Sequence, residues 1–372
     1  MYSKELESIK KSNRFRTREL FDDNLIDLAS NDYLGLSTNK TLFENAYKIL
    51  LKENYHSPKA SMLVNGYSKI HKKFEERLCQ VNDFEAGVIV GSGFLANISM
   101  IEALTRKNDT LFIDEEYHAS GILATKLLKP EQVIIFNHND FEDLEKKISQ
   151  NQRTGRNIIA IEGVYSMGGD LAPIEIFQIA DEKKAILIVD EAHSFGVIGD
   201  NLLGIFDYYK IKPTKYHVKM GTLGKAYGSY GAYILASKQI IDFLTNRAKP
   251  IIYSTAPSLF DTALANESLN YIIENKDLLK EKIEKNLNII KNILGLNSQS
   301  LIIPILIGDN KKVKKVQEEL KQHGFLVGAI RQPTVKEAII RLIAKIDINE
   351  NDLTKVCNLL KDSNVNKWFN KR

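Results

Sequence analysis

One lysine in the sequence stands where an amine could do chemistry. Lys225 lies in the run Met-Gly-Thr-Leu-Gly-Lys-Ala-Tyr-Gly-Ser-Tyr-Gly (220–231), between the apolar stretches 216–218 and 232–235. Glycines let the backbone approach a ligand closely. A lysine held there, partly desolvated and near other cations, loses proton affinity and becomes a usable nucleophile. Taken alone, the same run is also typical of a solvated surface turn.

Other polar groups follow apolar runs in the same way. His118 comes shortly after the run 110–113, and Asp190 directly closes the run 185–189, with His193 three residues further on. An aspartate at the end of a buried strand is costly unless it is paired, and its natural partner is a cation. Each residue by itself also has a structural explanation, as a helix cap or a core histidine.

Two further turns are rich in glycine and polar atoms. The turn 91–93 follows the apolar run 87–90 and opens the predicted helix 94–104, so its amides and the positive end of that helix suit a phosphate. The turn 162–170 follows the apolar run 157–161 and contains Ser166. As a motif, a glycine turn before a helix is weak, because ordinary turns look the same.

The strands and helices that would position these groups are predicted by a sequence pattern, in which short apolar runs alternate with stretches of helical length. The runs are 87–90, 110–113, 132–136, 157–161, 185–189 and 216–220, and the helices between them include 94–104, 141–148 and 173–182. This alternation predicts an α/β fold, in which a mostly parallel sheet has helices on both faces. Ligands of such sheets bind beyond the carboxyl ends of the strands, where the polar turns would converge.

The rest of the chain predicts a second, smaller domain. A helical pattern through 279–294 is stopped by Gly295, and the chain then continues from residue 301 as a compact α+β segment. We expect an N-terminal arm in 1–36, a large domain in 37–262 and a small C-terminal domain in 263–372.

Composition narrows the function classes. The chain has 372 residues and a net charge of +4 from 51 basic and 47 acidic residues, and its lysines are scattered rather than clustered as a nucleic-acid footprint requires. It has no apolar run as long as a membrane span, and its charged start lacks the apolar stretch of a signal peptide. Cys79 and Cys357 are too few for a disulfide framework or a metal site. We expect a soluble cytoplasmic protein with small-molecule substrates, no metal, and no nucleic-acid or membrane partner.

Together the turns supply an anion site, a histidine ring, an Asp/His pair and an amine. This set fits pyridoxal 5'-phosphate: the lysine forms a Schiff base, the aspartate keeps the pyridine nitrogen protonated, and the helix terminus takes the phosphate. Rival patterns are missing from the sequence, since Lys225 is followed by alanine rather than Ser or Thr, and neither a His-Glu-x-x-His helix nor a Gly-x-Ser-x-Gly elbow occurs.

Nine motifs give the sequence a family resemblance. They are SNDYLGLS (30–37), VNGYSKIH (64–71), GSGFLAN (91–97), HAS (118–120), EGVYSMGGD (162–170), VDEAHSFGVIG (189–199), GTLGKAYG (221–228), IYST (252–255) and IRQPTV (330–335). With these motifs in this order, the chain resembles the α-oxoamine synthases, which are fold-type-I pyridoxal phosphate enzymes, over nearly its whole length. The resemblance implies a large domain with a mostly parallel seven-stranded sheet, a smaller α+β domain, and a homodimer with shared active sites.

The resemblance also implies roles for individual residues. For the cofactor these are Lys225 in the Schiff base, Asp190 at the pyridinium nitrogen, His193 and Ser166 near the phenolic oxygen, His118 stacked on the ring, and Gly93, Phe94, Thr222 and Thr255 of a second subunit at the phosphate. For the substrates they are Asn31 and Arg341 at the amino-acid carboxylate, Thr334, and either Arg14 or Arg16.

The implied reaction is a decarboxylative condensation. L-Alanine displaces Lys225, whose freed amine removes the Cα proton, and the carbanion attacks an acyl thioester of coenzyme A or acyl-carrier protein. A sibling enzyme, glycine C-acetyltransferase, is the closest alternative; the run Met-Leu-Val-Asn-Gly-Tyr (62–67) favours the alanine enzyme. A catalytically silent partner subunit of the same fold is the alternative of another class, and retention of Lys225, Asp190 and His193 argues against it. The acyl chain and its carrier stay open.

Overall fold

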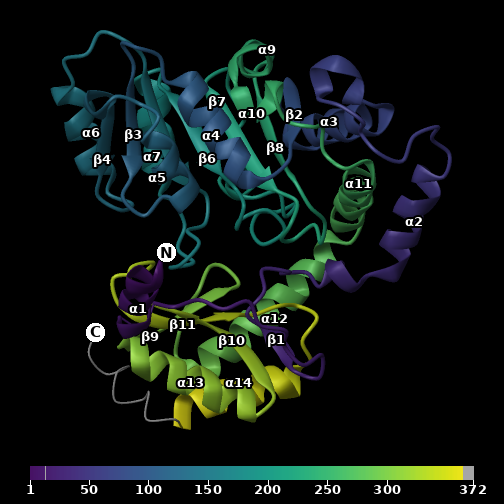
Figure 1. The fold of residues 1–372 in the computed structure, drawn as a ribbon, viewed down its shortest axis with the longest axis vertical. Helices are drawn as coiled ribbons and strands as arrows, with labels where there is room; N and C mark the ends of the chain where they lie inside the picture. The colour runs from purple at the N-terminus through teal and green to yellow at the C-terminus, as the bar shows by residue number, and fades with distance from the viewer. Residues whose placement is uncertain (13, 363–372) are drawn as a thin grey trace. The chain divides into compact units, whose positions relative to one another are not determined.

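The structure is a computed structural model that describes residues 1–12 and 14–362. The chain divides into two compact units, whose elements are labelled in Figure 1. The large unit comprises residues 34–166 and 170–280, and the small unit comprises residues 1–33, 167–169 and 281 onward.

The large unit is built on a seven-stranded sheet with the order β2-β8-β7-β6-β5-β3-β4. Its strands are β2 (Ala86–Val90), β3 (Thr110–Asp114), β4 (Val133–Phe136), β5 (Asn157–Glu162), β6 (Ile186–Asp190), β7 (His217–Thr222) and β8 (Ala232–Ala236). Only β8 runs against its neighbours, β7 and β2, while β3 to β7 pair in parallel. The mostly parallel seven-stranded sheet is therefore confirmed.

Helices cover both faces of this sheet. The helices of the large unit are α2 (Lys40–Leu50), α3 (Lys69–Asn82), α4 (Gly93–Leu104), α5 (Ala119–Thr125), α6 (Phe141–Gln150), α7 (Ile174–Glu182), α8 (Ile205–Tyr208), α9 (Lys238–Arg247), α10 (Lys249–Ile252) and α11 (Leu259–Glu274). Of these, α2 packs on α11, which in turn packs on α3, beside the sheet. α4, α9 and α10 share an apolar core with one face, to which Val218 of β7 contributes. His217 points to the other face, because successive strand residues alternate, and there it meets the rings of Phe177 and Phe206.

The predicted strands lie within about two residues of the observed ones, because buried β-branched runs have few alternatives in a sheet covered on both faces. One boundary differs: Gln132 was expected in a strand but closes a short helical turn, Pro130–Gln132. Its side chain donates to the Arg106 carbonyl at 2.6 Å, and that bond holds it outside β4.

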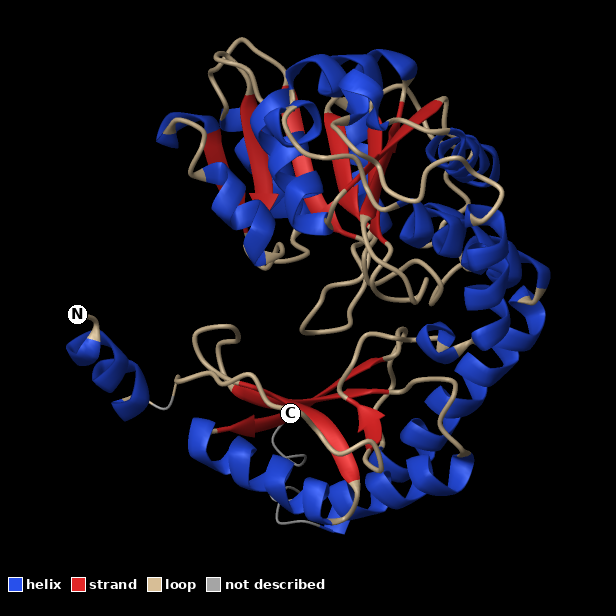
Figure 2. Ribbon diagram, turned by 45° about the vertical axis from the view of Figure 1, so that its right-hand side comes forward, coloured by secondary structure: helices blue, strands red, loops and turns tan. Residues whose placement is uncertain are grey.

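The small unit contains a four-stranded sheet with the order β1-β10-β11-β9, in which β1 (Ile26–Leu28) is parallel to β10 although the two lie almost 300 residues apart. The other strands are β9 (Ile302–Gly308), β10 (Phe325–Ile330) and β11 (Ala338–Ile343), and the helices are α1 (Ser3–Lys11), α12 (Lys276–Leu294), α13 (Asn310–Gln322) and α14 (Glu350–Asp362). Figure 2 shows helices along one face of this sheet. The division between the units falls within α12, which ends before Gly295 (φ +71°), the predicted stop.

Within the described part of the chain, no helix has both the length and the apolar character needed to cross a membrane.

Candidate active site

Lys225 sits in the turn that joins β7 to its antiparallel neighbour β8. Backbone bonds close the turn, from the Leu223 amide to the Gly231 carbonyl (2.9 Å) and from the Gly228 amide to the Lys225 carbonyl (2.9 Å). Gly228 needs its glycine, because it has a φ of +60° and an added Cβ would lie 2.5 Å from the Ser37 amide nitrogen. The turn places the Lys225 Nζ 2.8 Å from the Nε2 of His193.

Asp190 ends β6 and is held on two sides. Its Oδ2 accepts a bond from the Asn97 side chain at 3.0 Å, and its Oδ1 accepts one from the Ala192 amide at 2.9 Å. Tyr117 donates its hydroxyl to the Asn97 carbonyl oxygen at 2.7 Å, which fixes the orientation of the Asn97 amide. Sequence reasoning gave Asn97 no role, although it lies one helical turn after Gly93 in the motif 91–97.

His118 lies before α5 as its N-terminal cap. Its Nδ1 is 2.7 Å from the Ser120 hydroxyl, and that hydroxyl in turn accepts a bond from Asn97 at 2.9 Å. Partial burial lowers the pKa of His118; the nearby charge of Asp190 opposes this effect and that of Lys225 adds to it. His118, Asp190 and Lys225 therefore lie close enough to influence one another's charge. The His118 ring remains partly open to solvent, so it can stack on a ligand.

The N-terminus of α4 forms the anion end of the site. Ser92 caps this helix by accepting from the Leu95 amide at 3.3 Å, so Gly93 and Phe94 begin the first turn, where amides have no partner within the helix. A Cβ on Gly93 would lie 2.6 Å from the Thr222 methyl group. The Thr222 hydroxyl is buried and has no hydrogen-bond partner among the described residues. A positive helix end next to such a hydroxyl fits a phosphate group.

Glu162 is a buried carboxyl group that sequence reasoning left without a role. It ends β5 opposite Asp190 in the parallel register, and its Oε2 accepts a bond from the Ser166 amide at 3.1 Å. Burial raises its pKa well above the ordinary value, and the charge of Asp190 adds to this effect while Lys225 opposes it. Its signal in the sequence is the one used for Asp190, a carboxylate that directly follows a predicted strand.

In the small unit, two predicted substrate residues meet. Arg341 of β11 donates its Nη1 to the Asn31 side-chain oxygen at 3.0 Å, although 310 positions separate them in the sequence. The Tyr33 hydroxyl also lies 3.4 Å from that oxygen. Arg341 is buried, so its guanidinium is held in place by the sheet.

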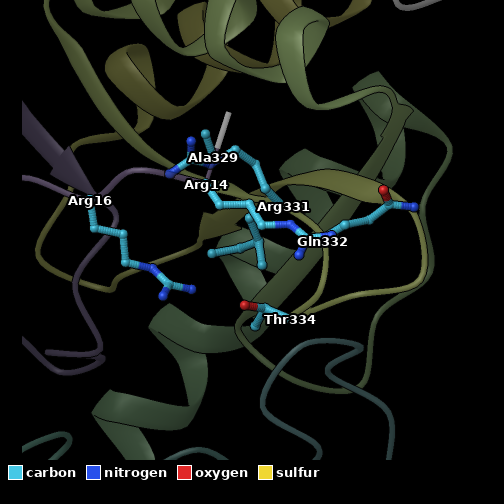
Figure 3. Close-up of a pocket in the computed structure, with 7 residues that line it drawn as sticks. Arg14, Arg16, Ala329, Arg331, Gln332 and Thr334 are labelled. Atoms are coloured by element: carbon cyan, nitrogen blue, oxygen red, sulfur yellow. The ribbon is translucent and has the colours of Figure 1, made fainter. Parts of the chain in front are cut away.

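A second cluster in the small unit forms a pocket of about 110 Å³. Its lining residues are Arg14, Arg16, Ala329, Ile330, Arg331, Gln332 and Thr334. Figure 3 shows that the pocket is formed by the N-terminal segment and by the end of β10 with the turn after it. Both arginines between which the sequence could not decide therefore line the same pocket as Thr334.

Thr255 lies in the large unit with an exposed side chain. It forms an antiparallel bridge with Ser61, and the next amide, of Ala256, donates to the Ala60 carbonyl at 3.0 Å. Among the described residues, no group of three or more His, Cys, Asp or Glu side chains is placed to hold a metal ion.

The fold, with a lysine, a histidine and an aspartate at the carboxyl edge of its sheet, defines the fold-type-I class of pyridoxal-phosphate-dependent transferases. The chain belongs to the family described as aminotransferase class I and II, which it matches over residues 23–360. Its relatives include the 8-amino-7-oxononanoate synthases of two Helicobacter pylori strains. The J99 protein is 48% identical over 97% of each chain, and the 26695 protein is 48% identical over 99% of each chain.

Solved structures agree in fold. A serine palmitoyltransferase K265A variant from S. paucimobilis, with a bound PLP-myriocin aldimine, superposes with a TM-score of 0.88 at 20% identity, covering 99% of this chain and 98% of that one. An 8-amino-7-oxononanoate synthase from Francisella tularensis gives a TM-score of 0.77 at 24% identity, covering 93% of this chain and 100% of that one. The predicted fold class, enzyme class and family resemblance are confirmed.

Proposed function

We propose that this protein is an 8-amino-7-oxononanoate synthase, which condenses L-alanine with a pimeloyl thioester and releases CO2 in biotin biosynthesis. The relatives' name supports the substrates: an oxo group on carbon 7 and an amino group on carbon 8 of a nine-carbon acid are what alanine and a seven-carbon dicarboxylic acyl group leave after loss of CO2. The observation that carries the particular reaction is the 48% identity to these synthases over nearly the whole chain, and the contact between Lys225 and His193 supports the pyridoxal phosphate chemistry. The charged composition supports a soluble cytoplasmic enzyme.

The residues of the large unit fit pyridoxal phosphate. Lys225 would hold it through the Nζ atom, and Asp190, fixed by Asn97, would hold the ring nitrogen in its protonated form. His193 and Ser166 would face the phenolic oxygen, His118 would cover the ring, and the start of α4 with Thr222 would take the phosphate. When bound, the cofactor supplies an electron sink for the carbanion that forms at the amino-acid Cα.

Proton transfer falls to Lys225. Once the substrate amine has displaced it, the Nζ atom is free to accept the Cα proton. Its position on a short turn between two paired strands limits the volume that the amine can sample. The Nε2 atom of His193 lies 2.8 Å from this Nζ atom. It would accept a hydrogen bond from Lys225 once Lys225 has taken up the proton.

Substrate anions would bind to the small-unit residues. Arg341, oriented by Asn31, suits the alanine carboxylate because a guanidinium can bind both carboxylate oxygens. The pocket of Arg14, Arg16, Arg331 and Thr334 suits a second anion (Figure 3). In a pimeloyl donor that anion is the distal carboxylate; a phosphate of the carrier is the other group with the same chemistry.

A homodimer would complete the site. In the family resemblance, Thr255 reaches the phosphate of the neighbouring subunit, and the exposed side chain of Thr255 supports such a role. Large apolar side chains are also exposed in the large unit. Tyr253 (80%) lies two residues before Thr255, Val64 (77%) lies three residues after its bridge partner Ser61, Phe43 (54%) lies on α2, and Leu51 (57%) directly follows α2. We propose that these side chains form part of the dimer interface.

A substrate panel tests the proposal. Purified protein is incubated with pyridoxal phosphate and each pair of an amino acid (L-alanine or glycine) and a thioester (pimeloyl or acetyl, on coenzyme A or acyl-carrier protein), and the aminoketone is identified by mass spectrometry. We expect 8-amino-7-oxononanoate from alanine and a pimeloyl donor. Product from glycine and acetyl-CoA alone would identify the sibling glycine C-acetyltransferase. Protein that stays colourless with added pyridoxal phosphate would identify a silent partner subunit.

A further inference from the structure

Glu162 and Asp190 form a pair of carboxyl groups that the proposed function uses only in part. They are opposite each other in the parallel register of β5 and β6. Neighbouring strands lie about 5 Å apart, and residues in register project from the same face of the sheet. Glu162 is 1% exposed and Asp190 3% exposed. Two carboxylates this close and this dry cannot both ionise without a large penalty, so the pair shares one proton.

The hydrogen bonds decide which carboxyl group keeps the proton. Asp190 accepts from the Asn97 amide at 3.0 Å and from the Ala192 amide at 2.9 Å, so donors stabilise both of its oxygens as a carboxylate. Glu162 accepts from the Ser166 amide at 3.1 Å through Oε2, and the backbone amide of His118 also lowers the pKa of this carboxyl group, but burial outweighs both donors. Its Oε1 is buried and has no hydrogen-bond partner among the described residues. The negative charge therefore belongs on Asp190 and the proton on Glu162.

The unpartnered oxygen also indicates a ligand. A buried polar atom without a hydrogen bond carries a substantial penalty, which a bound group can remove. Charged and titratable groups around Glu162 come from four elements: Asp190 from β6, Lys225 from the β7–β8 turn, Tyr117 and His118 from the segment before α5, and Tyr165 from the loop after β5. Asp190 is already committed to Asn97 and the ring nitrogen, and the Ser166 amide links Glu162 to the side of the site proposed for the phenolic oxygen.

We propose that Glu162 is a further residue of the cofactor site and acts as a neutral carboxylic acid that donates a hydrogen bond to an oxygen atom of the bound cofactor. This inference rests on the proposed function. It assigns opposite charge states to two neighbouring carboxyl groups, so that Asp190 remains the single negative charge of the pair. A neutral neighbour leaves the whole Coulombic effect of Asp190 for the protonated ring nitrogen.

The first experiment reads the proton directly. The infrared spectrum of the wild-type holoenzyme at neutral pH should contain the carbonyl stretch of a protonated carboxylic acid, which disappears in Glu162→Gln. The exposed Glu76, changed to Gln, is the control for the background. A difference spectrum that shows loss of a carboxylate band instead would overturn the proposal.

The second experiment follows the pH midpoint of the visible absorbance of the bound cofactor. Removing a negative charge within about 6 Å of a titrating cation lowers its pKa by about one unit or more. We therefore expect the pH midpoint to shift by less than about half a unit in Glu162→Gln, because this change removes no charge. The shift in Asp190→Asn should be larger. A shift of a full unit in Glu162→Gln would mean that Glu162 is ionised.

Turnover completes the test. Glu162→Ala should lower kcat by about tenfold or more, the contribution of one hydrogen bond in a closed site, and Glu162→Gln should recover most of this loss because its amide can still donate. Equal damage in both variants would contradict the donor role. Wild-type protein that bound no pyridoxal phosphate would instead refute the proposed function itself.

Discussion

The Nζ atom of Lys225 lies 2.8 Å from the Nε2 atom of His193, although the two residues are 32 positions apart and follow different strands of the sheet. This contact brings the amine to the edge where Asp190 ends its strand. If Lys225 holds the cofactor, Lys225→Ala should lose the visible colour of the holoenzyme and at least about 10³-fold of its turnover, since both the covalent link and the general base are gone. Absorbance and the aminoketone assay measure the two effects, with Lys238→Ala as the control lysine. Turnover that survived in Lys225→Ala would refute the role.

Asn97 should prove to be a positioning residue for Asp190. In Asn97→Leu, the Asp190 carboxylate loses the donor at 3.0 Å, and the hydroxyls of Tyr117 and Ser120 lose a partner. We expect weaker pyridoxal phosphate binding, by about tenfold, because a donor to a charged group contributes roughly 1.5–3 kcal/mol. A titration of the visible absorbance with pyridoxal phosphate measures this affinity. Unchanged affinity together with lowered thermal stability would leave Asn97 a purely structural role.

The arginine pocket of the small unit should control the acyl donor and not the amino acid. Replacing Arg14, Arg16 or Arg331 by Gln should raise KM for the pimeloyl donor by about tenfold, with KM for alanine unchanged. Comparing the pimeloyl thioester with the heptanoyl thioester, which lacks the distal carboxylate, separates the two possible anions. If the pocket binds the distal carboxylate, the variants and the wild type should have the same KM for the heptanoyl donor. If it binds a phosphate of the carrier, the variants should have a raised KM for both donors. Arg18, an exposed arginine outside the pocket lining, supplies the control variant Arg18→Gln. The comparison also decides between Arg14 and Arg16, which spacing alone could not.

His138 should make the stability of the large unit depend on pH. Its Nδ1 lies 3.0 Å from Asp114 and its Nε2 lies 2.8 Å from Asp170. Burial disfavours the charged ring, but these two hydrogen bonds outweigh it and raise the pKa of His138 to about 10. Because this folded value lies above the unfolded value of about 6.5, the stabilisation is complete below pH 6.5 and is lost as the pH rises through 10.

Chemical denaturation of wild type and His138→Gln across this range tests the prediction. The wild-type advantage should be about 1–3 kcal/mol at pH 6 and should shrink steadily toward pH 10. An advantage that stayed constant over the range would contradict a charged His138.

The proposed dimer can be broken at an exposed apolar side chain. Val64 is 77% exposed, so Val64→Asp should leave the folded subunit intact while placing a charge in the interface. We expect a monomer by light scattering and a loss of turnover, since Thr255 would no longer reach a neighbouring site. Leu20→Asp, at a side chain 100% exposed in the N-terminal segment, is the control and should remain a dimer. A Val64→Asp dimer with full turnover would place the interface elsewhere.

The sequence predicted the large-unit strands and the residues that follow them, because buried β-branched runs and the glycines beside them constrain the backbone locally. It could not pair Glu162 with Asp190. That relation depends on the register between β5 and β6, and no local pattern encodes this register because the two residues lie 28 positions apart in the sequence. The same holds for Asn31 and Arg341, whose contact depends on a sheet that joins the two ends of the chain. Helix caps and apolar runs can be recognised from a few neighbouring residues, whereas the pairs Glu162–Asp190 and Asn31–Arg341 form only when distant strands have assembled into a sheet.

Ala232, the first residue of β8, is paired with Val90 on one side and with Thr222 on the other. The glycine turn before α4 begins directly after Val90, and the lysine turn begins directly after Thr222. Because Val90, Ala232 and Thr222 are paired across three neighbouring strands, the two turns start at the same level of the sheet. Because β8 is held by pairing on both sides, an insertion in the lysine turn would be taken up in the turn and would move Lys225 relative to the start of α4. The distance between the amine and the phosphate end of the site therefore depends on the length of the lysine turn.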